Sequence, residues 1–454
     1  MQKAVTAAAS SAATPPASLG EIFWLWLKIG CINFGGPAGQ IALMHRIFVE
    51  EKKWLSEARF LHALNYCMLL PGPEAQQLAT YIGWLTHRTA GGLIAGILFV
   101  LPGALVMLGL SVLYVAYAGL EPVQGLLFGL KAAVLAVVIE AVIKVGNRVL
   151  KNTEMVLLAA AAFIGIFVFA VPFPVIVLGG AILGFIGGWF APERWSVIRQ
   201  QSAAEDALDA AAKLPPPPLA RTLTIAFWCA FAWAAPVVLT GLVFGWGSTF
   251  AELARFFSVM AIVTFGGAYA VLAYVAQEAV TTYGWLTAPE MLHGLGLAET
   301  TPGPLILVLQ FVGFLAGHRF PEGLDPWAGA VLASLIVTWV MFAPSFLWIF
   351  LGAPYVERLR GNRLLSAALS AITATVVGVI LNLAIWFGLH VLFRDLATVA
   401  AGPVQLLVPK LASIDPVAAI LAAAAALALI RFKVGMLKVL AASAAAGLAW
   451  TLYA

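Results

Sequence analysis

Apolar segments long enough to cross a bilayer recur along almost the whole chain, separated by short polar loops. Uninterrupted segments lie near 90–118, 123–143, 154–171, 172–190, 222–245, 327–350, 365–390, 416–430 and 434–453. Because about 20 apolar residues span the hydrocarbon core as a helix, each of these is expected to be a transmembrane helix. The pattern therefore predicts an all-α integral membrane protein.

Four further apolar segments are interrupted near their middle. Phe-Gly-Gly interrupts 20–45 and 250–275, whereas Pro-Gly-Pro interrupts 61–86 and 290–316. Backbone groups that lose their helical partners inside hydrocarbon must be satisfied by protein, water or ligand. We therefore expect these four interruptions to line a polar cavity.

Composition supports a membrane setting and excludes some functions. Hydrophobic residues make up 62% of the 454 residues and charged residues only 10%, too few polar groups to cover a soluble globule. The formal net charge of +4 is spread over loops, so nucleic-acid binding is excluded. Cys31, Cys67 and Cys229 lie singly in apolar segments, which favours buried thiols over a disulfide or metal site, and no cofactor is expected.

The chain contains a tandem repeat. A shift of 231 residues aligns both Phe-Gly-Gly motifs and both Pro-Gly-Pro motifs without a gap, with fourteen identities over the forty-five positions 34–78. We expect a flexible tail over 1–19, a first repeat over 20–190, a polar linker with one connecting span over 191–245, and a second repeat over 246–454. Each repeat then holds six segments.

Loop charge predicts that the two repeats are inverted. The loop 45–62 carries Arg46, Lys52, Lys53 and Arg59, whereas its equivalent 276–293 carries neither Lys nor Arg, so the two should face opposite sides of the membrane. Inversion follows if the interrupted segments are re-entrant hairpins, because an odd number of full spans then separates the repeats. Full crossings remain the alternative, although they place at least one basic cluster outside.

Inverted repeats with discontinuous helices are typical of secondary transporters, whose substrates bind near the membrane midplane. A proline suits the first turn of a helix, so new helices are expected to start at Pro37 and Pro73. Their unpaired N–H groups and positive dipole ends would face the cavity and favour an anion.

The sequence resembles the chromate ion transporter family in its long, two-domain form. The resemblance rests on "FGGPAGQIALMHR", "FLHALNYCMLLPGPEAQQLA", "TFGGAYAVLAYVAQEAV" and "GLGLAETTPGPLILVLQFVGF", and it covers about 20 to 453. It implies chromate efflux across the bacterial inner membrane by a multi-pass protein with thirteen membrane segments and antiparallel halves. Chromate and sulfate are both tetrahedral dianions, and sulfate remains an alternative substrate. The lipid bilayer is the expected surrounding, and a homodimer is left open.

Candidate substrate-binding residues cluster around the interruptions. They are Lys28, Asn33, Gly35, Gly36, Gln40, Gly72, Pro73, Gln76, Gln77, Thr264, Gly266, Gly267, Thr300, Thr301 and Gly303. At least one of the two adjacent glutamines is expected to reach the cavity as an amide donor. The alternatives are glycines that only let helices pack closely, and a lysine that extends to the membrane surface.

Two acidic residues are candidates for titration during transport. Glu74 follows the first Pro-Gly-Pro, and Glu299 precedes the second. A carboxylate at membrane depth is costly and usually functional. Glu74 has a structural alternative, because an acidic residue in the first turn also stabilises a helix.

The sequence gives less support to other classes of function. An intramembrane metalloprotease would need a motif such as H-E-x-x-H, and the six histidines form none, so no catalytic residue is assigned. A channel is the remaining alternative to a carrier that works by alternating access.

Overall fold

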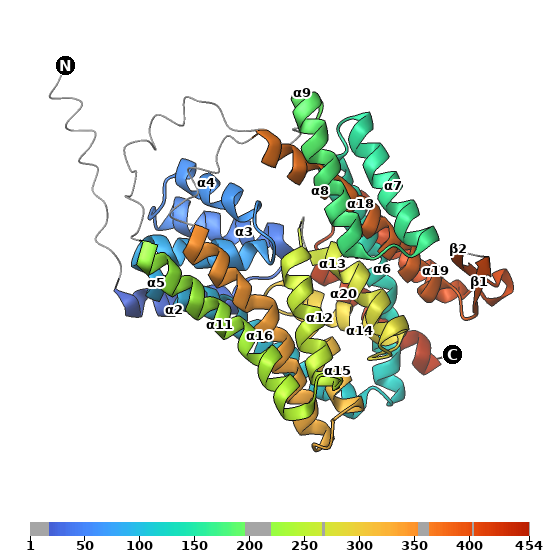
Figure 1. Cartoon of the computed structure of the whole chain (residues 1–454). Helices are drawn as coiled ribbons and strands as arrows, with labels where there is room; N and C mark the ends of the chain where they lie inside the picture. Colours follow the sequence, from blue (N-terminus) through green and yellow to red (C-terminus); the bar gives the residue numbers. More distant parts are fainter. Residues whose placement is uncertain (1–17, 196–218, 266–267, 353–362, 402–403, 454) are drawn as a thin grey trace.

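The computed structural model describes residues 18–195, 219–265, 268–352, 363–401 and 404–453, and almost all of them are helical (Figure 1). The first part contains α2 (Leu19–Ile32), α3 (Gly36–His45), the π-helix η1 (Arg46–Glu51), α4 (Glu57–Cys67), α5 (Glu74–Tyr117), α6 (Glu121–Val149), α7 (Thr153–Phe169), α8 (Phe173–Phe190) and the short α9 (Pro192–Trp195). The expected tail and most of the polar linker lie outside the described residues.

The second part begins with α11 (Leu219–Phe244), α12 (Thr249–Val263), α13 (Ala268–Gln277) and the π-helix η3 (Glu278–Thr282). It continues with α14 (Ala288–Thr300), the 3₁₀ turn η4 (Leu305–Leu307), α15 (Val308–Arg319), α16 (Pro326–Gly352), α18 (Arg363–Leu392), η6 (Leu411–Ser413), α19 (Pro416–Ala426), η7 (Leu427–Arg431) and α20 (Met436–Tyr453).

Membrane spans appear where hydrophobicity predicts them. Within the described ranges, seven helices are long and apolar enough to cross a bilayer, namely α5, α6, α8, α11, α16, α18 and α20. Three shorter apolar helical stretches, 153–169, 305–319 and 416–431, fall in other predicted segments. The prediction of a helical, multi-pass membrane protein is thus confirmed.

Each of the four motifs coincides with an interruption between helices. At the Phe-Gly-Gly motifs, α2 ends at Ile32 before α3, and α12 ends at Val263 before α13. At the Pro-Gly-Pro motifs, α4 ends at Cys67 before α5, and α14 ends at Thr300 before η4. Helices α3 and α5 begin within one residue of their predicted starts, Pro37 and Pro73.

Equivalent backbone features recur at the shift of 231. The N–H of Trp54 donates to the carbonyl of Phe48, and the N–H of Trp285 donates to that of Ala279. The side chain of Ser56 caps α4 and that of the equivalent Thr287 caps α14. The π-helices η1 and η3 also occupy matching positions. The two halves therefore share detailed local structure as well as sequence landmarks.

In three of the four interrupted segments, contacts join the chain after the break to the chain before it. Trp26 of α2 contacts Phe48 of η1, with ring centroids 5.0 Å apart, and Phe256 of α12 stacks on Tyr274 of α13 at 6.0 Å. Arg319, at the end of α15, pairs with Glu290, at the start of α14, at 2.6 Å. The two ends of the α14–α15 unit therefore lie next to each other.

Long helices pack on one another through small residues, as is common in membranes. A methyl group added at Gly317 of α15 would collide with the carbonyl of Gly329 on α16, and one at Gly378 of α18 with the carbonyl of Ala159 on α7. A sharp turn at His87 and Arg88, both outside helical backbone angles, likewise folds the start of α5 onto its longer remainder.

A two-stranded antiparallel hairpin departs from the expected all-helical fold. Strand β1 (Leu396–Ala401) pairs with β2 (Val404–Pro409) between α18 and α19. Thr398 and Val399 supply β-branched residues, and no apolar run long enough to span a membrane marks this stretch.

Near the hairpin, the side chain of Asp415 caps the start of α19. Burial opposes its ionisation, but the N–H of Ala418 and the Arg394 guanidinium hold the pKa of Asp415 below its ordinary value.

The glycine contacts predict a stability difference between two helix-interior positions. Gly317→Ala should lower the free energy of unfolding by about 1–3 kcal/mol, because the methyl group overpacks the α15–α16 contact. Gly109→Ala in α5 is the control: a methyl group there meets nothing within 4 Å, so stability should stay or rise by up to about 1 kcal/mol. Thermal unfolding in detergent measures both. Equal stability of the two variants would contradict the packing argument.

Candidate functional site

The four interruptions meet at one cavity. It is lined by Pro37, Gln40, Gly72, Pro73, Glu74, Ala75, Thr264, Ala268, Pro304, Leu305 and Ile306. These residues belong to the starts of α3, α5, α13 and η4 and to the end of α12. Both repeats therefore contribute to a single site.

Two reciprocal backbone hydrogen bonds join the repeats beside the cavity. The N–H of Gly72 donates to the carbonyl of Thr264 at 2.8 Å, and the N–H of Gly303 donates to the carbonyl of Asn33 at 3.3 Å. The two glycines are equivalent at the shift of 231, and so are the two acceptors. Each Pro-Gly-Pro loop thus binds the end of the helix that precedes the other half's Phe-Gly-Gly.

Both donor glycines adopt backbone angles that require glycine. Gly72 has φ of +115° and Gly303 has φ of +106°, in the left-handed region. A methyl group at Gly303 would also approach Leu307 and Gly103, and one at Gly72 would approach Gln77 and Ser345. The two loops therefore depend on glycine for both their shape and their close packing.

Helices that start at the cavity lack side-chain caps. Gly35 before α3, Pro73 before α5 and Pro304 before η4 make no capping hydrogen bond. By contrast α2, α4, α7, α12, α14 and α19 are each capped by a Ser, Thr, Asn or Asp side chain. Helices α6 and α8 also lack such caps, but they do not reach the cavity. No side chain thus caps the first turn of α3 or of α5 at the cavity.

Buried amide side chains support the loops and leave their oxygens free. Asn33 donates to the carbonyl of Phe99 at 3.2 Å, Gln40 to that of Asn33 at 3.1 Å, and Gln77 to that of Pro71 at 2.6 Å. Because each NH₂ group faces a carbonyl, the amide orientation is fixed. Among the described residues, the side-chain oxygen of each has no hydrogen-bond partner, and Gln76 has none for either atom.

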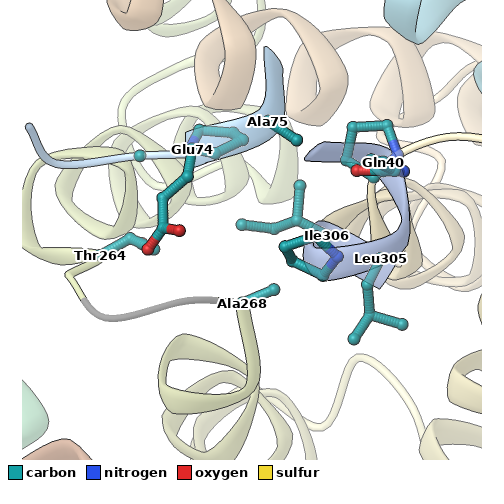
Figure 2. A pocket seen from close by; sticks show the side chains of 11 residues that line it. Gln40, Glu74, Ala75, Thr264, Ala268, Leu305 and Ile306 are labelled. Atoms are coloured by element: carbon teal, nitrogen blue, oxygen red, sulfur yellow. The ribbon is translucent and has the colours of Figure 1, made fainter. Parts of the chain in front are cut away.

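Glu74 brings a carboxylate into this space. In Figure 2 its side chain extends from the start of α5 toward Thr264, and Gln40 lies across the cavity. Among the residues that the structure describes, the lining includes no Lys, Arg or His. Glu299 has a different environment. It is only 4% exposed and accepts a hydrogen bond of 2.6 Å from the Tyr269 hydroxyl, outside the lining.

The expected binding residues divide into several groups. Gln40, Gly72, Pro73 and Thr264 line the cavity, whereas Asn33, Gln77 and Gly303 lie one contact behind it. The remaining described candidates outside the lining are Lys28, Gly35, Gly36, Gln76, Thr300 and Thr301. Gly266 and Gly267 lie outside the described residues.

Three of these candidates have side-chain positions that explain their place outside the lining. Lys28 is exposed on α2, on the face opposite to the buried Trp26. Thr300 and Thr301 donate to the carbonyls of Leu297 and Ala298, within their own helix. The hydroxyls therefore bind backbone at the end of α14.

The lining also includes residues absent from the expected set, namely Pro37, Ala75, Ala268, Pro304, Leu305 and Ile306. All occupy the first turn after an interruption, or the proline that precedes it. In the sequence, only their position after an interruption marks them as cavity residues, since most are apolar and have no distinctive chemistry.

The fold and cavity define a multi-pass membrane protein with a central site formed from interrupted helices. A family model described as chromate transporter matches residues 20–185 and 251–448, so the chain belongs to the chromate transporter family. It is 31% identical to a chromate transport protein of Pseudomonas aeruginosa over 382 residues, covering 83% of this chain and 82% of that one.

Two further relatives carry related names. A probable chromate transport protein of Synechococcus elongatus is 28% identical over 395 residues, with 87% of this chain and 90% of the relative covered. A chromate transport protein of Cupriavidus metallidurans is 27% identical over 377 residues, with 83% and 84% covered. No solved structure matches at a significant level. Membership indicates a transporter rather than an enzyme.

The glycine geometry predicts loss of transport on substitution. Gly72→Val or Gly303→Val should abolish chromate transport while membrane insertion persists, because a β-branched residue costs at least about 1–2 kcal/mol at positive φ and displaces the loop from the cavity. Chromate resistance of cells and uptake into vesicles measure the effect.

Gly323→Val is the matched control, since Gly323 has φ of +86° with open space around it and lies outside the lining. This variant should keep its transport rate per folded molecule. Full transport by both cavity variants would show that the loop geometry serves packing alone.

Proposed function

We propose that this protein exports chromate from the cytoplasm across the bacterial inner membrane by alternating access, with the dianion bound in the cavity between the repeats. One observation carries the proposal: uncapped helix starts from both repeats surround a single cavity. Helix N-termini bind anions through N–H groups and the helix dipole. Family membership supplies the chromate assignment.

Backbone amides are the donors in this proposal. The NH₂ groups of Asn33, Gln40 and Gln77 already donate to carbonyls and shape the loops. The first-turn N–H groups of α3 and α5 donate to no capping side chain. A tetrahedral oxyanion, which accepts hydrogen bonds in several directions, matches donors that converge from different helices.

Inverted, re-entrant repeats form part of the same proposal. The contact of Arg319 with Glu290 supports a hairpin that returns to the side from which it enters. The exchange of hydrogen bonds between Gly72, Thr264, Gly303 and Asn33 supports a pseudo-twofold relation between the halves. Rocking of one half against the other would then expose the cavity to each side in turn. Membrane potential favours outward movement, because the cytoplasm is negative and the substrate is a dianion.

Transport in inside-out vesicles tests the substrate and direction. Vesicles with the protein should accumulate labelled chromate with saturation at a carrier rate, and an excess of sulfate should compete only weakly. Vesicles with Gly303→Val should match vesicles without the protein. Stronger competition by sulfate than by unlabelled chromate would favour the alternative, a sulfate or other oxyanion carrier, and flux without saturation would favour a channel.

Single-cysteine labelling tests the inversion. Glu51 and Thr282 are exposed and occupy equivalent positions in the two repeats. In a background with Cys31, Cys67 and Cys229 replaced, Glu51→Cys should react with a membrane-impermeant reagent only from the cytoplasmic side, and Thr282→Cys only from the outside. Labelling of both from the same side would contradict inverted repeats.

A further inference from the structure

The negative charge of an ionised Glu74 would oppose the binding of a dianion in the cavity. Within the described part of the chain, its lining contains one ionisable side chain, Glu74, and no cationic one. A dianion beside an ionised glutamate would bring three negative charges into one small site. Such like-charge contact disfavours ionisation of the carboxyl group. The substrate therefore needs a positive partner if it is to enter.

Neighbouring ionisable groups do not supply that partner. Arg148 on α6 and the Cys67 thiol on α4 lie within electrostatic reach of Glu74. The Arg148 side chain is exposed and contacts the sulfur of Met68 at 3.7 Å, so solvent screens its charge. Tyr66 on α4 donates to the carbonyl of Trp348.

Charged side chains on other elements around α5 lie away from the cavity. Lys28 of α2 is exposed, and His45 at the far end of α3 pairs with Glu50 and Glu57. On the opposite side of the cavity, Tyr269 of α13 is bound to Glu299. Glu74 thus stands as the one cavity-lining group, among the described residues, that can gain or lose a charge.

We infer that Glu74 carries a proton together with the oxyanion, so that this transporter is a proton–oxyanion symporter. Without the oxyanion, the uncapped first turn of α5 favours the ionised form of Glu74, because amides there favour negative charge. An arriving dianion takes over those amides, and Glu74 becomes neutral by taking one proton from the same aqueous side. Release on the other side reverses both steps.

Symport follows because proton and dianion favour each other's binding. An antiporter would require the two to exclude each other, which is the reverse of the electrostatics in this cavity. The cycle then moves two negative charges and one positive charge in the same direction. This inference rests on the proposed oxyanion transport and adds its coupling ion.

Proteoliposomes with a clamped membrane potential provide the test. Sulfate and chromate are used above the pH range in which chromate itself takes up a proton. With the outside more acidic by about one pH unit, wild-type protein should accumulate the oxyanion about tenfold, since one proton accompanies each dianion. Entry of the oxyanion should also acidify the lumen, as read by a trapped pH dye.

Two variants separate the possible carriers of the proton. Glu74→Gln resembles the neutral form, so it should still equilibrate the oxyanion but lose the tenfold accumulation and the lumenal acidification. Its flux should carry two charges per oxyanion, against one in the wild type. Glu299→Gln is the matched control, a buried carboxylate outside the lining, and should keep the wild-type response.

The outcomes distinguish this inference from the proposed function. Absence of any oxyanion uptake by the wild type would overturn the proposed function itself. Uptake that ignores the pH gradient, uptake driven by a sodium gradient instead, or coupling lost in Glu299→Gln and kept in Glu74→Gln would each overturn symport through Glu74 alone. Complete loss of transport in a correctly folded Glu74→Gln protein would also overturn symport through Glu74.

Discussion

Backbone hydrogen bonding inside hydrocarbon is the constraint on which the site depends. A helix that stops within the membrane leaves amides and carbonyls that lipid cannot satisfy. Here the stops occur in pairs, and the N–H of each Pro-Gly-Pro glycine binds a carbonyl of the opposite repeat. The two loops thereby hold each other in place, and the uncapped first turns of α3 and α5 lie at a shared cavity. Glycine is needed at both donor positions because φ is positive there.

The arrangement suggests how binding and movement are linked. Contacts between the repeats at the cavity include two backbone hydrogen bonds and the packing of short loops. Away from the cavity, helices of opposite repeats also pack closely, as α18 does on α7 at Gly378. Movement of one half relative to the other would therefore have to repack these helix contacts as well. A dianion held between α3 and α5 of one half and η4 of the other would favour the arrangement in which the two halves converge. Under the symport we infer, Glu74 also reduces the charge moved per cycle, so that the membrane potential drives export with half the force available to a bare dianion.

Much of this organisation was predictable because its signals are strong in sequence. Hydrophobic length places the spans, and glycine and proline place the interruptions at Gly72 and Gly303, since few other residues tolerate the required backbone. Side-chain direction was harder to predict. Lys28 was a candidate because it precedes an interruption, yet it lies on the exposed face of α2, opposite Trp26. Leu305 and Ile306 line the cavity through their place in a first turn, for which apolar residues give no chemical signal. The β1–β2 hairpin lies in a stretch without the length of a membrane span.

The most direct measurement is the position of the bound anion. A structure of the protein determined with chromate, whose chromium scatters X-rays anomalously, should show one peak between the first turns of α3 and α5, bounded by Thr264 and Pro304. Chromate bound elsewhere, with this cavity empty at a saturating concentration, would contradict the account.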